Sequence, residues 1–221
     1  MSRHVFFGGT FDPVHCGHLD VADAARQAFG VETMTLIPAA VPPHRARPRA
    51  SAAHRFAMVA LAIHARPHDR LSDLEMLSTE PSYTAATLDR LEHNGVDTRR
   101  CALAIGADAF REIATWRAYP AILDRCSFVV VSRPSVAVAA LREALPDLAP
   151  RMVDVRPGRA AGAADRPCIF LVDAPTAPVS STDIRRRVAE GASIHGLVPA
   201  AVAEYIHTHG LYVEKDSTAS A

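Results

Sequence analysis

Apolar and polar residues form two kinds of pattern along this chain of 221 residues. Short continuous apolar runs are typical of buried strands, and apolar residues spaced three or four apart are typical of amphipathic helices. The runs predict strands over 5–7, 31–37, 71–77, 101–105, 128–131, 152–155 and 168–172. The periodic segments predict helices over 19–29, 51–65, 82–95, 137–145, 180–190 and 200–207.

The alternation of strands and helices predicts an α/β fold, a mostly parallel sheet with helices on both faces. We expect a single domain over 1–213 and a disordered tail over 214–221. The segment 156–167 is rich in Gly, Ala, Arg and Pro, so we expect a surface loop there. In the helix over 51–65 the spacing places one set of residues on the buried face: Phe56, Val59, Ala60 and Ile63.

The turn after the first apolar run is rich in glycine and carries two histidines. It reads Gly8-Gly9-Thr10-Phe11-Asp12-Pro13-Val14-His15-Cys16-Gly17-His18. Glycine lets backbone N–H groups approach an anion, and the start of the following helix leaves N–H donors unpaired. His15 and His18 are three residues apart, so their side chains should point to the same side. The pattern predicts a phosphate site equipped for chemistry on a nucleotide, in which the two histidines donate hydrogen bonds and positive charge to a phosphate.

Further candidate residues follow other predicted strands. Because ligands of parallel sheets bind at the carboxyl ends of the strands, we expect these residues to gather at one edge. They are His44 and Arg45 on a proline-rich loop, Asp108, Trp116 and Arg133. Asp108 can accept hydrogen bonds from a ribose or help to arrange a metal, and its alternative role is to cap a loop. Trp116 can stack on a flat ring or belong to the core.

Two helix starts offer additional anion sites. Tyr83 and Thr84 begin one helix, where backbone N–H groups and the Thr84 hydroxyl suit a carboxylate. Ser180 begins another with a typical N-cap, and Arg185 about one turn later can add a bidentate contact to a phosphate. The alternative for each is an ordinary capped helix.

Composition narrows the function classes. The formal net charge is zero and the sequence pI is near 7.2, so the chain as a whole lacks the basic footprint of a nucleic-acid binder. The four cysteines form no C-x-x-C pair, which indicates reduced thiols. No apolar run approaches the roughly 20 residues of a membrane span. We expect a cytoplasmic protein with no nucleic-acid or membrane partner, and a homo-oligomer is left open.

The glycine–histidine turn resembles the signature of the H-x-G-H nucleotidyltransferase superfamily. Within it, the chain closely resembles the bacterial nicotinate-nucleotide adenylyltransferase family. Further matching stretches run in the same order along the chain: 37–38 with 42–45, 81–84, 105–108, Trp116, 128–134, 179–185 and 210–212. Each stretch alone is weak evidence for the family, but their order and spacing together are specific to it.

The resemblance implies transfer of the adenylyl group of ATP to nicotinate mononucleotide, and it implies roles for individual residues. The implied catalytic residues are His15, His18 and Arg185. The implied ATP-binding residues are Gly8, Gly9, Thr10, Phe11, His15, His18, Asp108, Ser180, Ser181, Thr182 and Arg185. The implied mononucleotide-binding residues are Thr10, His44, Arg45, Tyr83, Thr84 and Trp116, with Trp116 stacking on the pyridine.

The substrates themselves suggest the mechanism. A 5′-phosphate is already an anion near neutral pH, so it needs no protein base to attack the α-phosphorus of ATP. We therefore expect catalysis by positioning and charge stabilisation without a covalent intermediate. Mg²⁺ is the expected cofactor, held mainly by ATP phosphates and not by protein side chains.

Three other functions are alternatives to this one. Another H-x-G-H enzyme, with a nicotinamide mononucleotide or phosphopantetheine acceptor, would keep the same chemistry, but a phosphopantetheine enzyme would not explain 81–84 together with Trp116. A dinucleotide-dependent oxidoreductase would require G-x-G-x-x-G in the first turn, which is missing. A non-catalytic nucleotide-binding module would leave His15, His18 and Arg185 unexplained.

Overall fold

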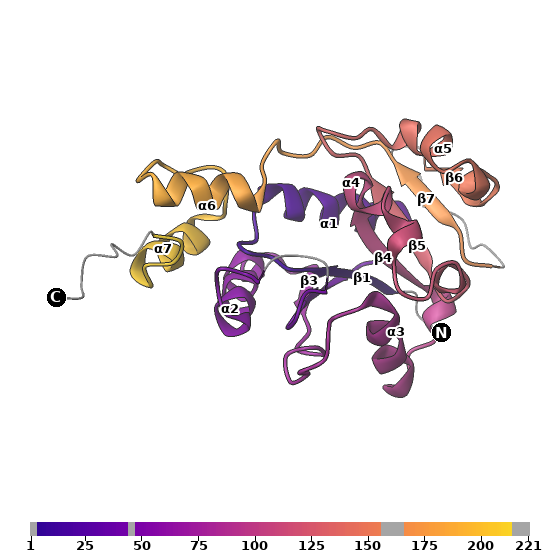
Figure 1. Cartoon of the computed structure of the whole chain (residues 1–221), viewed down its shortest axis with the longest axis horizontal. Coiled ribbons are helices and arrows are strands. Elements are labelled where there is room, and N and C mark those ends of the chain that lie inside the picture. The colour runs from indigo at the N-terminus through magenta and orange to yellow at the C-terminus, as the bar shows by residue number, and fades with distance from the viewer. Residues whose placement is uncertain (1–3, 44–46, 156–165, 214–221) are drawn as a thin grey trace.

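The computed structural model describes residues 4–43, 47–155 and 166–213. Their strands form one sheet in the order β3-β2-β1-β4-β5-β7-β6, and every neighbouring pair is parallel. The strands are β1 (His4–Gly9), β2 (Met34–Pro38), β3 (Asp69–Leu71), β4 (Cys101–Gly106), β5 (Ser127–Val131), β6 (Met152–Asp154) and β7 (Ile169–Val172). The predicted parallel α/β architecture is confirmed (Figure 1).

The α-helices of the described residues are α1 (Cys16–Phe29), α2 (Ala52–Ile63), α3 (Thr84–His93), α4 (Ala107–Phe110), α5 (Leu141–Ala144), α6 (Ser181–Ala189) and α7 (Ala200–Thr208). Several begin where the sequence carries a cap: the Ser51 side chain accepts from the His54 N–H at the start of α2. Gly30 ends α1 in the left-handed conformation that glycine adopts without steric cost.

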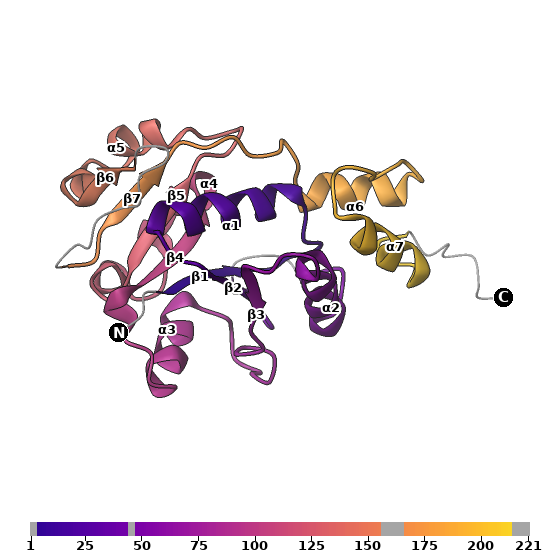
Figure 2. The same cartoon turned by 180° about the vertical axis from the view of Figure 1, so that it is seen from behind.

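Residues that alternate along each strand enter two separate hydrophobic cores. Val5 and Phe7 of β1 pack in the core that also contains the buried residues of α1 and α2. Phe6, between them, packs in the core on the other face, with the buried residues of α3, α4 and α5. The sheet is therefore covered on both faces, as predicted (Figures 1 and 2).

The order of the strands reverses at β1, which pairs with β2 on one side and with β4 on the other. In open parallel sheets, ligands bind beyond the carboxyl ends of the strands at such a switch point. The helices α6 and α7 lie at one end of the molecule, near α2, as both views of the chain show (Figures 1 and 2). The switch point between β1 and β4 is the place where the fold would hold a ligand.

Two local predictions were wrong. The strand predicted over 71–77 ends at Leu71, and Leu77 is 96% exposed. The actual strand, β3, begins at Asp69, a buried polar residue paired with Arg66. Because the strand starts with a polar residue, a run of apolar residues does not indicate where it begins. The buried face of α2 is also rotated from the prediction: Val59 and Ile63 are buried, but Ala60 is exposed and Phe56 is only partly buried. The predictions for 156–165 and 214–221 lie outside the described residues.

Candidate active site

The turn after β1 uses its two glycines for different reasons. Phe11 has a φ of 50° and turns its ring back beneath Gly9, where a Cβ would lie 2.8 Å from the Phe11 Cζ atom. A side chain at Gly9 would therefore displace a buried aromatic ring. A Cβ at Gly8 would meet no atom within 4 Å, and Gly8 lines a cavity. Gly8 thus keeps open a space that a side chain would otherwise occupy.

His15 and His18 form a reciprocal cap at the start of α1. The His15 Nδ1 accepts from the His18 N–H, and the His18 Nδ1 accepts from the His15 N–H, both at 3.3 Å. The rings stack with centroids 3.6 Å apart, and the edge-on Phe11 ring supports that of His18. With both Nδ1 atoms accepting, a neutral ring carries its proton on Nε2. In that state each histidine carries an Nε2–H donor, a group that can bind a phosphate oxygen.

The charge on the two histidines was expected to be positive, and for His15 the structure contradicts this. Burial, and then the nearby Arg133 guanidinium, lower the pKa of His15 to about 3, so the ring is neutral near pH 7. Arg133 supplies the positive charge here: it donates to the Gly17 carbonyl at 3.0 Å and to the Val179 carbonyl at 3.1 Å. A Cβ at Gly17 would lie 2.8 Å from an Arg133 nitrogen, which explains the glycine between the histidines.

The start of α6 lies against the same turn. Ser180 caps this helix by accepting from the Asp183 N–H, and the Ser181 hydroxyl donates to the Pro13 carbonyl at 2.9 Å. Arg185 donates to the Asp12 carbonyl at 2.6 Å and to the Thr182 hydroxyl at 3.1 Å. The amino ends of α1 and α6, with Arg185 between them, therefore meet at one place. Two helix starts and an arginine together favour the binding of an anion.

Asp108 lies on the neighbouring strand end, in the first turn of α4. Its Oδ1 accepts from the Ala109 N–H at 2.9 Å, and the carboxylate is exposed. A Cβ at Gly106 would clash with this carboxylate and with the Arg133 side chain, so the glycine allows both to lie at the end of β4. Asp108 does not line the cavity described next.

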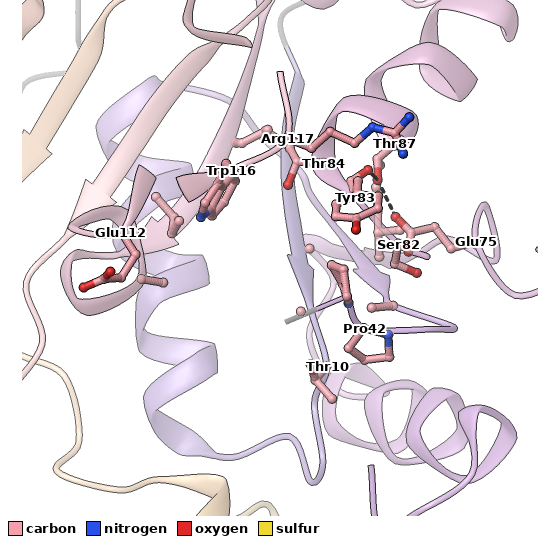
Figure 3. Close-up of a pocket in the computed structure, with 18 of the residues that line it drawn as sticks. Thr10, Pro42, Glu75, Ser82, Tyr83, Thr84, Thr87, Glu112, Trp116 and Arg117 are labelled. Carbon is pink, nitrogen blue, oxygen red and sulfur yellow. Dashed lines mark hydrogen bonds between the residues drawn. The ribbon is translucent and has the colours of Figure 1, made fainter. Parts of the chain in front are cut away.

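A cavity of about 410 Å³ opens at the ends of β1, β2 and β4 (Figure 3). Its walls include six of the predicted residues: Gly8, Gly9, Thr10, Tyr83, Thr84 and Trp116. The α3 helix begins at Thr84 and has no side-chain cap, so its first N–H groups are not satisfied by a side chain. Trp116 packs edge-on against Phe128, with 6.5 Å between ring centroids. The structure thus brings an indole and a helix start to one cavity, next to Gly8, Gly9 and Thr10.

Arg117 also lines the cavity, and its place was not predicted. Its guanidinium lies over the Tyr83 ring, 5.0 Å from the ring centroid, and so reaches from the Trp116 loop toward α3 (Figure 3). It adds a positive charge to a wall that also carries the side chains of Glu75 and Glu112 (Figure 3). His44 and Arg45, the remaining predicted residues, lie outside the described part of the chain.

Two buried residues that support the turn were also missed. Arg55 of α2 is 1% exposed and donates to the carbonyls of Thr10, Ala39 and Ala40 at 2.6 to 3.0 Å. Asp12 is 5% exposed and accepts from two backbone N–H groups, those of Arg49 and Ala50. Asp12 lies inside the quoted motif, but nothing in the sequence indicates its partners. Arg55 lies on a face that hydrophobic periodicity assigns to solvent.

Among the described residues, no three His, Cys, Asp or Glu side chains are grouped so that they could hold a metal ion. Within the same ranges, no helix is both long and apolar enough to cross a membrane.

The fold and the meeting of helix starts at a glycine–histidine turn define a nucleotidyltransferase-type site, and comparison with known proteins agrees. The cytidylyltransferase-like family model matches residues 6–187. Two curated relatives carry the name "Probable nicotinate-nucleotide adenylyltransferase". The protein from Yersinia pestis (strain Pestoides F) is 37% identical, over 96% of both chains. That from Cronobacter sakazakii (strain ATCC BAA-894) is 39% identical, over 94% of both chains.

A solved structure has the same fold. Plasmodium falciparum nicotinic acid mononucleotide adenylyltransferase, complexed with NaAD, superposes with a TM-score of 0.73 at 17% identity, covering 96% of this chain and 98% of that one. The chain belongs to the cytidylyltransferase-like family and, within it, to the nicotinate-nucleotide adenylyltransferases.

Proposed function

We propose that this protein transfers the adenylyl group of ATP to nicotinate mononucleotide, forming nicotinate adenine dinucleotide and pyrophosphate, a step in NAD biosynthesis. Its relatives carry the name of this activity. The observation that carries the proposal is the meeting of two helix starts, α1 and α6, beside a cavity that contains an indole and a third helix start. The first feature suits a triphosphate and the second suits a flat anionic ring.

On the ATP side, the Nε2–H groups of His15 and His18 would donate to the phosphates. The amino end of α6, with Ser180, Ser181 and Thr182, would face them from the other side, and Arg185 would add a charged contact. Gly8, Gly9, Thr10 and Phe11 would shape the backbone of the turn around the nucleotide. Asp108, at the end of β4, would accept hydrogen bonds from the ATP ribose or help to arrange a metal.

On the acceptor side, Trp116 would stack on the pyridine ring, and the start of α3 at Tyr83 and Thr84 would donate to its carboxylate. Arg117 strengthens the preference for an anionic ring, because its guanidinium lies in the same cavity. Thr10 would contact the mononucleotide where the two halves of the site meet. His44 and Arg45 are proposed as ligands of its phosphate on the basis of the sequence.

In the reaction, a 5′-phosphate oxygen of the mononucleotide forms a bond to the α-phosphorus. The bond from that phosphorus to the oxygen bridging the β-phosphate breaks, and pyrophosphate leaves with the electron pair. No proton has to be removed from the attacking phosphate. The histidines, held by each other's backbone, donate to oxygens on which charge grows, and Arg185 stabilises the same charge.

Mg²⁺ would be bound chiefly by the phosphate oxygens of ATP. The chemistry of the donors present fits this arrangement, since Asp108 offers an exposed carboxylate at the strand ends, the ligand type that Mg²⁺ prefers. When bound, the ion would neutralise the leaving pyrophosphate.

The test is pyrophosphate release from Mg·ATP with nicotinate mononucleotide, nicotinamide mononucleotide and phosphopantetheine assayed in parallel. The proposal predicts a clear preference for the nicotinate form. A preference for either other acceptor would preserve adenylyl transfer but overturn the acceptor assignment. Release with none of the three would favour a nucleotide-binding module.

A further inference from the structure

The C-terminal segment reaches back to the glycine–histidine turn through one side chain. The Tyr212 hydroxyl donates to Asp12 Oδ1 at 2.8 Å, across 200 positions of sequence. The backbone of Tyr212 has a φ of 67°, a conformation that residues with side chains rarely adopt. Burial and the Asp12 carboxylate raise the pKa of Tyr212, so the hydroxyl remains a donor. The backbone at Tyr212 thus has an uncommon conformation, in which the side chain donates one hydrogen bond to the turn.

Asp12 is also close to the arginine proposed to hold the ATP phosphates. The Arg185 guanidinium donates to the Asp12 carbonyl, but its distance to the Asp12 carboxylate oxygen Oδ2 is 3.8 Å, too long for a hydrogen bond. Asp12 Oδ1 is instead occupied by Tyr212 and by the Ala50 N–H, and Oδ2 by the Arg49 N–H. A buried carboxylate with fewer donors would attract its nearest cation more strongly.

We propose that Tyr212 is a positioning residue for adenylyl transfer: by satisfying the Asp12 carboxylate, its hydroxyl keeps Arg185 available for the phosphates of ATP. Without that hydroxyl, Asp12 and the triphosphate compete for the same guanidinium. The inference rests on the proposed function for the identity of the phosphates that Arg185 binds. It assigns the C-terminal segment a role in the active site, although Tyr212 does not line the cavity.

The direct test is Tyr212→Phe, which removes only the hydroxyl. Binding of Mg·ATP is measured by calorimetry without an acceptor, and KM for each substrate is measured in the full reaction. We expect Kd and KM for ATP to rise about tenfold, because the variant would lose one charge-assisted hydrogen bond between Arg185 and the phosphates. We expect KM for the mononucleotide to change less than twofold, because the cavity around Trp116 does not contain Tyr212.

Tyr205→Phe is the matched control. The Tyr205 hydroxyl also joins the C-terminal region to the rest of the chain, through a 3.0 Å hydrogen bond with His54 of α2, but it has no contact with Asp12. We expect both variants to lower the melting temperature slightly and only Tyr212→Phe to weaken ATP binding. Equal ATP binding by Tyr212→Phe and the parent, or parallel losses in both variants, would overturn the proposal.

A double-mutant cycle tests the route through Asp12. If Tyr212 acts by satisfying the carboxylate, Tyr212→Phe should have little further effect on ATP binding in an Asp12→Asn background, where the charge is gone. Additive effects would overturn the proposed route. Failure of the proposed function gives a different result: the parent protein would bind Mg·ATP but release no pyrophosphate with nicotinate mononucleotide. A parent that does not bind Mg·ATP would overturn both.

Discussion

His15 and His18 hold each other in place: each Nδ1 accepts the other residue's backbone N–H, and the two rings stack 3.6 Å apart. The reciprocal cap uses Nδ1 of each ring, and the proposed contact with a phosphate uses Nε2. Structure and chemistry thus depend on different atoms of the same side chain. The two roles can be separated by substitution.

His18→Asn is expected to keep the fold and lose turnover. An Asn amide can reach the position of Nδ1 and preserve the cap, but it does not extend to the position of Nε2. Turnover should fall by about two orders of magnitude, as for loss of one donor to a transition-state oxyanion. His18→Ala should lose similar turnover and in addition about 1 kcal/mol of stability, because the cap is lost. Melting temperatures and kcat of both variants provide the comparison, and near-parental turnover in either folded variant would remove His18 from the mechanism.

The low pKa of His15 makes stability depend on pH. The folded protein binds this proton only near pH 3, whereas the unfolded chain binds it near pH 6.5. The contribution is therefore complete above pH 6.5 and is lost progressively as the pH falls toward 3. Between pH 7 and pH 5, the parent should lose about 2 kcal/mol more unfolding free energy than His15→Asn, which keeps the cap acceptor. Urea denaturation at both pH values measures this, and equal losses would show that His15 titrates normally.

The two glycines of the turn should respond differently to a methyl group. Gly8→Ala places a Cβ in open space beside the cavity, so the protein should fold with an unchanged melting temperature and lose at least tenfold in kcat/KM. Gly9→Ala places its Cβ against the Phe11 ring and should cost about 1–3 kcal/mol of stability. The reverse pattern, with a stable Gly9→Ala and a destabilised Gly8→Ala, would contradict the geometry of the turn.

Arg117 should discriminate between the acid and amide forms of the acceptor. We expect Arg117→Gln to lower kcat/KM for nicotinate mononucleotide about tenfold, the cost of one charged contact, and to leave the value for nicotinamide mononucleotide nearly unchanged. Arg111→Gln removes the same charge from an exposed position just after α4 that does not line the cavity, and it should alter neither value. Equal losses for both acceptors would assign Arg117 a structural role.

The parts of the fold that could be predicted are those determined by local pattern. Neighbouring residues in the sequence determine three such elements: the glycine turn, the Ser180 cap and the buried strand at 101–106. The supports of the turn could not be predicted, because their partners are distant. Arg55 satisfies three carbonyls from a helix position outside the apolar face that periodicity predicts, and Tyr212 contacts Asp12 from the other end of the chain.

The same reasoning explains the misplaced elements. β3 begins at the buried Asp69, a polar residue that lies before the predicted strand over 71–77, and α2 turns Arg55 inward, which rotates its buried face. The charge of His15 depends on burial and on Arg133, which follows β5 more than a hundred residues later. Motif spacing predicts the candidate site residues, whereas their protonation and supporting contacts required the folded chain.

The most direct test of the account is an experimental structure of the protein with nicotinate adenine dinucleotide bound. We predict that the pyridine stacks on Trp116 with its carboxylate at the start of α3, and that the diphosphate lies between His18 and the amino end of α6. A pyridine bound away from Trp116, or phosphates that contact neither helix start, would contradict the assignment of the two halves of the site.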